Sequence, residues 1–269
     1  MPHSFDPDGS VVVVTGAGSG IGRALALRAG ASGARAVVVC DIDEVGARAT
    51  ASLLAHETGG VEIVRTVNLD VSNGAAVAEA AEQVELEVGP IDLWCSNAGI
   101  HRGEGLGDDA AWRESWDLHV LAHVYVARHV VPRMTARGRG WLLVTASAAG
   151  LLSDFTSAPY TVTKHAAVAF AEWLSIRHGD DGVNVSCVCP QAVNTAMNST
   201  RRGSTAGSGA KFLEPDDVAA QCYAALASGA FLVLPHPEVA AYEQRRAGDR
   251  DRWLAGMRRT SAQLKSSNN

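Results

Sequence analysis

Tyr160 and Lys164 stand four residues apart in the segment 156–179, whose alanine-rich pattern predicts a helix. Residues four apart lie on one face of a helix, one turn from each other. A tyrosine phenol has a pKa of about 10, too high for a base at neutral pH. An ammonium at about 4 Å favours the phenolate by about 4 kcal/mol, or roughly three pKa units. The pair therefore predicts a tyrosine general acid/base, although the same spacing also occurs on ordinary helix faces.

Ser147 ends the apolar run 140–147, thirteen residues before Tyr160. A serine at the carboxyl end of a parallel strand lies at the edge where doubly wound sheets bind ligands. Its hydroxyl would hold a substrate oxygen beside Tyr160. The alternative is a serine that only closes a strand.

A glycine-rich loop, 15–22 (TGAGSGIG), follows the run of four valines at 11–14 and opens the first predicted helix. Glycines allow a sharp turn and a close approach of the backbone to a diphosphate, which the helix N-terminus attracts. The alternative is a tight strand–helix turn without a ligand, which this context disfavours. The predicted cofactor contacts in the loop are Gly16, Gly18, Ser19, Gly20, Ile21 and Gly22.

Asp41 ends the second apolar run, nineteen residues after Gly22. A carboxylate there accepts hydrogen bonds from the hydroxyls of an adenosine ribose and repels a 2′-phosphate. At about 4 Å, each pair of unit charges contributes about 4 kcal/mol. The neighbours Cys40 and Ile42 carry no positive charge, and the glycine loop has Ser19 rather than a base. The sequence therefore predicts NAD rather than NADP.

Short β-branched runs alternate with longer helical patterns along the chain. Continuous apolar runs of this kind are typical of parallel strands buried on both faces. The runs are residues 11–14, 36–41, 61–70, 91–96, 140–147, 183–190 and 231–234, and the predicted helices are 20–32, 43–58, 73–88, 110–137, 156–179 and 215–228. The alternation predicts an α/β fold: a single-domain, doubly wound (Rossmann) sheet of about seven parallel strands with helices on both faces, over residues 1–269.

Two segments depart from this alternation. The stretch 201–210 (RRGSTAGSGA) is small and polar, and it follows the sixth predicted strand. We interpret the region 196–213 as a substrate lid, the alternative being a passive loop. The C-terminal extension 238–269 contains an amphipathic helix around Trp253, Leu254 and Met257, either a surface helix or a subunit contact.

The composition excludes several functional classes. The 269 residues are 47% hydrophobic and 19% charged, with a net charge of -6, which argues against non-specific binding of nucleic acid. No apolar segment is long enough for a signal peptide or a membrane span, so no membrane partner is expected. The five cysteines are scattered among apolar residues and are expected to be buried thiols in a cytoplasmic protein, with no metal site.

Taken together, these motifs resemble the short-chain dehydrogenase/reductase family, from about Val11 to about Pro237. The loop 15–22 resembles the family's TGxxxGIG. Residues 96–99 (SNAG) resemble NNAG, with Ser96 in place of Asn. Residues 190–195 (PQAVNT) resemble PGxVxT, with Gln191 in place of Gly. The resemblance implies further cofactor contacts from Ile42, Asp70, Val71, Asn97, Ala98, Gly99, Pro190, Val193 and Thr195, besides Asp41, Tyr160 and Lys164.

The main departure from the family falls on His119, where the family usually has an asparagine that helps to hold a water in a proton relay. A neutral imidazole both donates and accepts hydrogen bonds, so His119 can continue such a relay. The alternative is a packed core histidine. The expected catalytic set is therefore Ser147, Tyr160 and Lys164, with His119 as its fourth member.

The predicted function is NAD-dependent hydride transfer between a secondary alcohol or ketone and the nicotinamide, with Tyr160 as general acid/base. We expect a moderately hydrophobic substrate, such as a terpenoid, steroid-like or aromatic alcohol. The residues expected to line its pocket are Ala149, Leu151, Leu152, Phe155, Gln191, Ala192 and Met197.

Three alternatives stay open from the sequence. The first is an NADPH-dependent carbonyl reductase on the same fold, and the second is a protein that binds NAD as a sensor or scaffold without turnover. The third is an epimerase or dehydratase of the related extended fold, for which the chain is short. The family resemblance also implies a homo-oligomer, a tetramer or dimer, that shares the helices at 110–137 and 156–179.

Overall fold

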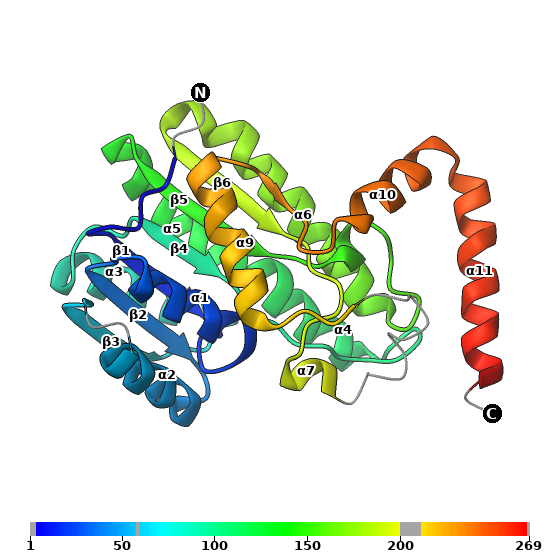
Figure 1. Ribbon diagram of the computed structural model, residues 1–269, viewed down its shortest axis with the longest axis horizontal. Helices are drawn as coiled ribbons and strands as arrows, with labels where there is room; N and C mark the ends of the chain where they lie inside the picture. The colour runs from blue at the N-terminus through cyan, green and yellow to red at the C-terminus, as the bar shows by residue number, and fades with distance from the viewer. Residues whose placement is uncertain (1–3, 58–59, 200–210, 268–269) are drawn as a thin grey trace.

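The computed structural model describes residues 4–57, 60–199 and 211–267. Their strands form one sheet in the order β3-β2-β1-β4-β5-β6-β7, and every neighbouring pair is parallel. This confirms the predicted doubly wound sheet (Figure 1). The chain order reverses between β1 and β4, where such sheets open a crevice for ligands. The strands are β1 (Val11–Thr15), β2 (Ala36–Asp41), β3 (Ile63–Asn68), β4 (Leu93–Ser96), β5 (Gly140–Thr145), β6 (Val183–Val188) and β7 (Leu232–Val233).

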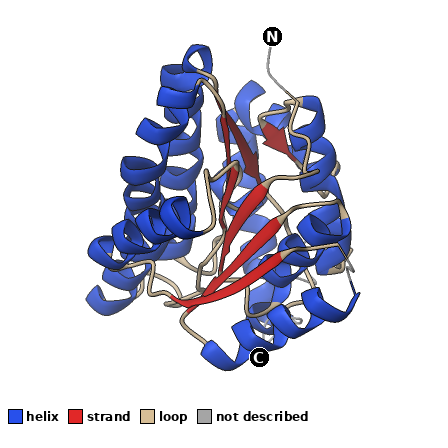
Figure 2. Cartoon of the chain, turned by 90° about the vertical axis from the view of Figure 1, so that its left-hand side faces the viewer, coloured by secondary structure: helices blue, strands red, loops and turns tan. Residues whose placement is uncertain are grey.

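Helices cover both faces of the sheet (Figure 2). One face packs against α1 (Gly20–Ala31), α2 (Glu44–Glu57) and α9 (Pro215–Ser228). The other face packs against α3 (Gly74–Glu87), α5 (Ala122–Arg137) and α6 (Ala158–His178). The two helical layers bury the central strands β1, β2, β4 and β5 almost completely, which explains their continuous apolar runs, whereas the edge strand β3 is partly exposed and contains Arg65, Thr66 and Asn68.

The valines of β1 show how one strand supplies both cores. Successive side chains of a strand point to opposite faces. Val11 and Val13 join the core beneath α3, α5 and α6, whereas Val12 and Val14 join the core beneath α1, α2 and α9. All four are essentially inaccessible to solvent. A run of four valines therefore stabilises two layers at once.

The segment predicted as one helix, 110–137, is interrupted. It consists of α4 (Asp109–Trp116), a five-residue π-helical turn (Asp117–Leu121) and α5. The apolar periodicity of this segment did not reveal the wider turn. A π-turn holds one residue more than an α-turn, and it is often found at functional sites. His119 lies at its centre.

The expected lid and the C-terminal extension differ from the prediction in detail. A short helix, α7 (Ala196–Ser199), begins the expected lid, whereas residues 200–210 lie outside the described residues. The C-terminal extension forms two helices, α10 (Glu238–Gly248) and α11 (Arg250–Ser267), separated by the extended residue Asp249. In Figure 1, α11 stands beside the body of the molecule.

All five cysteines are buried without a disulfide, as expected. Among the described residues, no helix has both the length and the hydrophobicity needed to span a bilayer.

Two leucine substitutions test the assignment of the core. Leu143 in β5 is fully buried, whereas Leu86 in α3 is 78% exposed. Leu143→Ala removes buried methyl groups and leaves a cavity, so it should lower the free energy of unfolding by about 2–5 kcal/mol. Leu86→Ala is the matched control and should change it by less than about 0.5 kcal/mol. Urea unfolding measures both, and equal losses would contradict the assignment.

Candidate active site

Tyr160 lies in the first turn of α6, where capping interactions fix its position. Ser157 caps the helix: its Oγ accepts a hydrogen bond from the Tyr160 N–H at 3.3 Å and donates one to the Arg102 carbonyl at 3.1 Å. Pro159 occupies the first turn, where its missing N–H has no consequence. The start of α6 is thereby tied to the segment that follows β4.

Lys164 lies one turn further along α6 and is buried, with 4% of its surface exposed. Its Nζ donates a hydrogen bond to the Thr145 carbonyl at 3.0 Å and lies 5.8 Å from the centroid of the Tyr160 ring. Burial lowers the pKa of Lys164 to about 8, while Cys187 and Cys189 act in the opposite direction. The predicted pairing of Tyr160 with Lys164 on one helix face is therefore present.

Ser147 lies two residues beyond the end of β5 and caps a short 3₁₀ turn, Ala148–Gly150. Its Oγ accepts a hydrogen bond from the Ala149 N–H at 3.1 Å and donates a long one to the Pro190 carbonyl at 3.5 Å. The 3₁₀ turn packs directly on α6, because a Cβ at Gly150 would lie 2.5 Å from the Lys164 carbonyl oxygen. A glycine at this position lets the strand end that carries Ser147 approach the helix that carries Tyr160 and Lys164.

His119 is fully buried, and both of its ring nitrogens have protein partners. Nε2 accepts a hydrogen bond from the Ile100 N–H at 3.2 Å, and Nδ1 lies 2.9 Å from Thr163 Oγ1. Since Nε2 is the acceptor, Nδ1 carries the proton and donates a hydrogen bond to Thr163 Oγ1, which in turn donates one to the Pro159 carbonyl. Burial, and next the charge of Lys164, lower the pKa of His119 well below its usual value. The imidazole is therefore neutral, and it connects the π-turn to α6 and to the segment after β4.

Ser96 stands where the family motif has an asparagine, and it also contacts a histidine. Ser96 Oγ lies 2.7 Å from Nδ1 of His123 in α5, and both side chains are buried. Burial, and next the charge of Lys164, lower the pKa of His123 to about 3, so this imidazole is also neutral. Two neutral imidazoles thus lie near the lysine without adding positive charge.

A third histidine, His101, contacts Tyr160 and was missed by the sequence interpretation. The ring centroids of His101 and Tyr160 are 4.7 Å apart, and Nε2 of His101 lies 3.7 Å from Oδ2 of Asp154. His101 follows β4 and Asp154 precedes α6, so no local spacing pairs them. The only available signal was that His101 comes two residues after Gly99, at the predicted ligand-binding edge of the sheet.

The glycine loop has the shape of a diphosphate cradle. A Cβ at Gly16 would lie 2.8 Å from the Cα of Ala98, and one at Gly20 would lie 3.0 Å from Cγ2 of Thr195. Among the described residues, no side-chain hydrogen bond caps the N-terminus of α1 at Ser19, and the first turn of this helix contains no acidic residue. The N–H groups there suit an anion. Loop and helix therefore fit the diphosphate of a dinucleotide.

The carboxylate of Asp41 reaches back to the glycine loop. Oδ2 accepts a hydrogen bond from the Gly18 N–H at 2.7 Å, and Oδ1 accepts one from the Asp43 N–H at 2.9 Å. The guanidinium of Arg23, the residue that follows the loop, also reaches it: Arg23 donates to the Gly18 carbonyl and, at 2.9 Å, to Thr50 Oγ1. The predicted adenosine end of the loop therefore has both a carboxylate and an arginine close to Gly18.

Asn97 connects three strands at the reversal of chain order. Its Nδ2 donates to the Thr15 carbonyl at 3.1 Å, and its Oδ1 accepts from Thr145 Oγ1 at 3.0 Å. Thr15 Oγ1 in turn accepts the Asn97 N–H at 3.0 Å. These bonds hold the ends of β1, β4 and β5 together around the predicted cofactor contacts Ala98 and Gly99. Further along the same edge, Asp70 is exposed and accepts hydrogen bonds from Ser72.

The residues expected to contact substrate differ in exposure. Ala149, Leu151 and Ala192 are buried, whereas Phe155 and Met197 are each 40% exposed. The Oε1 of Gln191 is buried and has no hydrogen-bond partner in the part of the chain that the structure describes. The Gln191 N–H donates to Nδ1 of His236 at 3.1 Å. The predicted set thus combines an apolar wall with one amide oxygen that lacks a partner.

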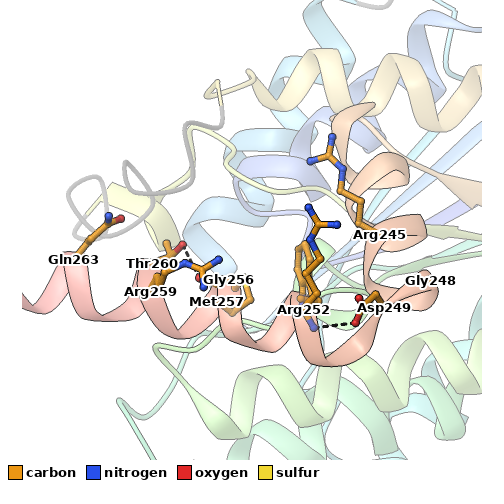
Figure 3. A pocket seen from close by; sticks show the side chains of 10 residues that line it. Arg245, Gly248, Asp249, Arg252, Gly256, Met257, Arg259, Thr260 and Gln263 are labelled. Atoms are coloured by element: carbon orange, nitrogen blue, oxygen red, sulfur yellow. Dashed lines mark hydrogen bonds between the residues drawn. The ribbon is translucent and has the colours of Figure 1, made fainter.

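A separate hollow of about 820 Å³ lies between α10 and α11 (Figure 3). Arg245, Arg252 and Arg259 contribute to its lining, together with Met257 and Gln263. These residues come from the C-terminal helices, and none of them belongs to the ends of the strands. This hollow is therefore separate from the edge of the sheet that holds Tyr160.

Comparison with known proteins agrees with this geometry. A family model described as short chain dehydrogenase matches residues 10–205. The chain is 36% identical over 251 residues to 1-deoxy-11-beta-hydroxypentalenate dehydrogenase of Streptomyces avermitilis, which covers 89% of this chain and 88% of that protein. It is 34% identical over 194 residues to epidermal retinol dehydrogenase 2 of Homo sapiens, covering 70% of this chain but only 62% of that protein.

A solved structure is similar over nearly its whole length. The short chain dehydrogenase/reductase of Burkholderia phymatum, in complex with NAD, superposes with a TM-score of 0.83 at 30% identity. The match covers 92% of this chain and 96% of that one.

The buried ammonium of Lys164 predicts a pH-dependent stability. Because folding lowers its pKa from 10.5 to about 8, the unfolded chain binds more protons than the folded chain between these two values. Stability therefore rises with pH across that window, while the full penalty of about 3 kcal/mol is present below pH 8. The free energy of unfolding of the wild type, relative to that of Lys164→Met, should increase by about this amount from pH 7.5 to pH 10.5. Urea unfolding at both pH values measures it, and a difference that does not change with pH would contradict the prediction.

Proposed function

Because this chain belongs to the short-chain dehydrogenase/reductase family, we propose that it catalyses NAD-dependent hydride transfer between a secondary alcohol and the corresponding ketone, with Tyr160 as general acid/base. One observation carries the proposal. The buried ammonium of Lys164 lies one helical turn from Tyr160, with Nζ 5.8 Å from the centroid of its ring. A cation in this position favours the phenolate that a tyrosine base requires.

In the oxidising direction, the Ser147 hydroxyl holds the substrate oxygen, and Tyr160 removes the proton of that hydroxyl. When bound, the nicotinamide accepts the hydride that leaves the carbinol carbon. Lys164 stabilises the phenolate before the proton moves, and it would also hold the ribose of a bound dinucleotide. In the reducing direction the same proton returns from Tyr160 to the carbonyl oxygen, so Tyr160 acts as the acid.

His119 acts as a positioning residue in this proposal. Its Nε2 is occupied by the Ile100 N–H and its Nδ1 by Thr163. A relay through the imidazole would have to break one of these hydrogen bonds, at a free-energy cost of the order of 1–3 kcal/mol for a buried group. Because the ring stays neutral, it also avoids repelling the Lys164 ammonium.

NAD is the preferred cofactor in this proposal. The carboxylate of Asp41 lies at the glycine loop, where it would repel a 2′-phosphate. The Burkholderia phymatum protein, 30% identical, is described in complex with NAD. The second candidate is NADP, which one observation favours: the Arg23 guanidinium also reaches Gly18.

The substrate is a moderately hydrophobic alcohol. The expected lining is mostly apolar, from buried Leu151 and Ala192 to the partly exposed Phe155 and Met197. The relatives described above are named as dehydrogenases of retinol and of a hydroxypentalenate. These names agree with a small-molecule alcohol as the partner of this chain.

A protein that binds NAD without turnover is the competing function. Such a protein has no need to bury an ammonium beside a tyrosine. Removing Lys164 from water costs free energy that the single hydrogen bond to Thr145 offsets only in part. The buried charge therefore favours catalysis over binding alone.

Self-association through α6 is the proposed quaternary arrangement. Val162, Trp173 and Ile176 leave 44%, 56% and 85% of their surfaces exposed. Their spacing places them along one side of the helix, and an exposed apolar stripe of this kind is typical of a subunit contact.

Tyr160→Phe tests the chemistry. It removes the proton-transferring hydroxyl but keeps the ring, so turnover with NAD⁺ and a secondary alcohol should fall by about 10²–10⁴-fold. The dissociation constant for NAD, measured by calorimetry, should change by less than about threefold. Tyr125→Phe in α5 is the matched control and should keep its activity. If Tyr160→Phe retained a tenth or more of the wild-type kcat, Tyr160 would not be the acid/base.

Asp41→Ser tests the cofactor preference. Loss of the carboxylate removes the repulsion of a 2′-phosphate, so the ratio of kcat/KM for NADP to that for NAD should rise at least about tenfold. Asp43→Ser removes a nearby exposed carboxylate and should leave the ratio unchanged. Arg23→Gln is a third variant, and it should lower the ratio of kcat/KM for NADP to that for NAD if Arg23 contributes to NADP binding. A wild type that prefers NADP would overturn the choice of NAD.

A further inference from the structure

His101 and Asp154 form a polar pair beside Tyr160 that the mechanism above does not use. The imidazole comes from the segment after β4, and the carboxylate comes from the loop before α6. Nε2 of His101 and Oδ2 of Asp154 are 3.7 Å apart. We propose that this pair, called here the His101–Asp154 subsite, binds a second hydroxyl of the substrate. The proposal rests on the proposed function, because it assigns the substrate class of the same site.

The subsite lies on the outward side of Tyr160. The Tyr160 ring contacts His119 edge-on, with centroids 5.6 Å apart, and contacts His101 at 4.7 Å with an angle of 40° between the ring planes. The side chain of His119 is fully buried, whereas those of His101 and Asp154 keep 12% and 20% of their surfaces exposed. Of the two histidines that contact Tyr160, His101 is therefore the one that a molecule arriving from solvent meets.

The polar atoms of the subsite are complementary to a hydroxyl. Nε2 of His101 is buried and has no hydrogen-bond partner in the residues that the structure describes. The 3.7 Å to Oδ2 of Asp154 exceeds the length of a hydrogen bond. A hydroxyl both accepts and donates, so it satisfies an imidazole N–H and a carboxylate oxygen together. An apolar group in the same place would leave the buried nitrogen unsatisfied, which is unfavourable.

The carboxylate of Asp154 is held in place before any ligand arrives. Its Oδ1 accepts hydrogen bonds from the Thr156 N–H at 2.8 Å and from Thr156 Oγ1 at 2.5 Å. The backbone of Asp154 bonds Thr161 Oγ1 on α6 at both its N–H and its carbonyl, each at 2.7 Å. Arg102, which follows His101 directly in the sequence, pairs with the exposed Glu114. The subsite is thus preorganised, which favours specific binding.

This arrangement points to a secondary alcohol that carries a second hydroxyl on the neighbouring carbon, and to the corresponding hydroxyketone in the reducing direction. The first oxygen occupies the position between Ser147 and Tyr160, and the second occupies the His101–Asp154 subsite. The apolar lining contacts the carbon skeleton. A site built to bond a hydroxyl discriminates strongly against the analogue that lacks it.

The first experiment compares two substrates with one skeleton, trans-cyclohexane-1,2-diol and cyclohexanol. The wild type should have a kcat/KM for the diol at least about tenfold above that for the mono-alcohol. His101→Phe keeps a ring against Tyr160 but loses the N–H, so this ratio should fall at least about tenfold, mainly through KM for the diol. His101→Gln keeps a donor and should restore part of the ratio. His56→Gln on α2, an exposed histidine, is the control and should not alter it.

Asp154→Asn provides a second route to the same conclusion, since it removes the acceptor charge without changing the shape of the side chain. It should also lower the preference for the diol. If the two substrates lose activity equally in His101→Phe and Asp154→Asn, the residues only support Tyr160, and the subsite does not exist.

The second experiment does not need turnover. Ligand-observed NMR measures the binding of both compounds to the NAD complex of Tyr160→Phe, with and without His101→Phe. The diol should bind at least about tenfold more tightly than cyclohexanol, and His101→Phe should remove that difference. Diol-selective binding by a protein whose wild type never turns over would support the subsite and overturn the proposed function. Equal binding of the two compounds would overturn the subsite, whatever the activity.

Discussion

The hydrogen bond from Lys164 to the Thr145 carbonyl places a positive charge inside the molecule, directly beneath the edge where the strands end. Several other features depend on keeping that charge there. Gly150 lets the end of β5 approach the backbone of Lys164, and neutral His119 and His123 lie near the ammonium without repelling it. A buried charge is unfavourable for folding. Its retention beside Tyr160 is the clearest sign that this edge evolved for chemistry rather than for stability.

The reversal of chain order between β1 and β4 brings the two functional halves together. The glycine loop continues from β1, and Asn97 follows β4, so the first strands on either side of the reversal provide the two walls of the crevice. The hydrogen bonds of Asn97 to Thr15 and from Thr145 prevent these strand ends from separating. The valines buried on both faces of the sheet make the edge rigid, because neither helical layer can shift without opening a core.

Local patterns predicted much of this arrangement. Three features involve only residues close together in the sequence, so they can be read from it directly. They are the valine run, the glycine loop and the four-residue spacing of Tyr160 and Lys164. The π-turn at Asp117–Leu121 escaped because the apolar periodicity continues through it. The pair His101–Asp154 escaped for another reason: its partners come from different elements, and only the folded chain determines that they meet. Arg23 follows the glycine loop directly, but whether its side chain turns back to Gly18 depends on its rotamer, which no local pattern predicts.

The π-turn also has a consequence for how the crevice can change over evolutionary time. It contains one residue beyond the number that an α-helix would need, and each residue of an α-helix turns the chain by about 100°. Deletion of that residue would leave one regular α-turn, which covers nearly the same rotation, so α4 would keep its orientation against α5 and against α6, the helix that carries Tyr160. The turn thus absorbs the gain or loss of one residue. Such a change alters the hydrogen bonding around His119, while the helices beside the crevice, and the charge beneath the strands, stay where they are.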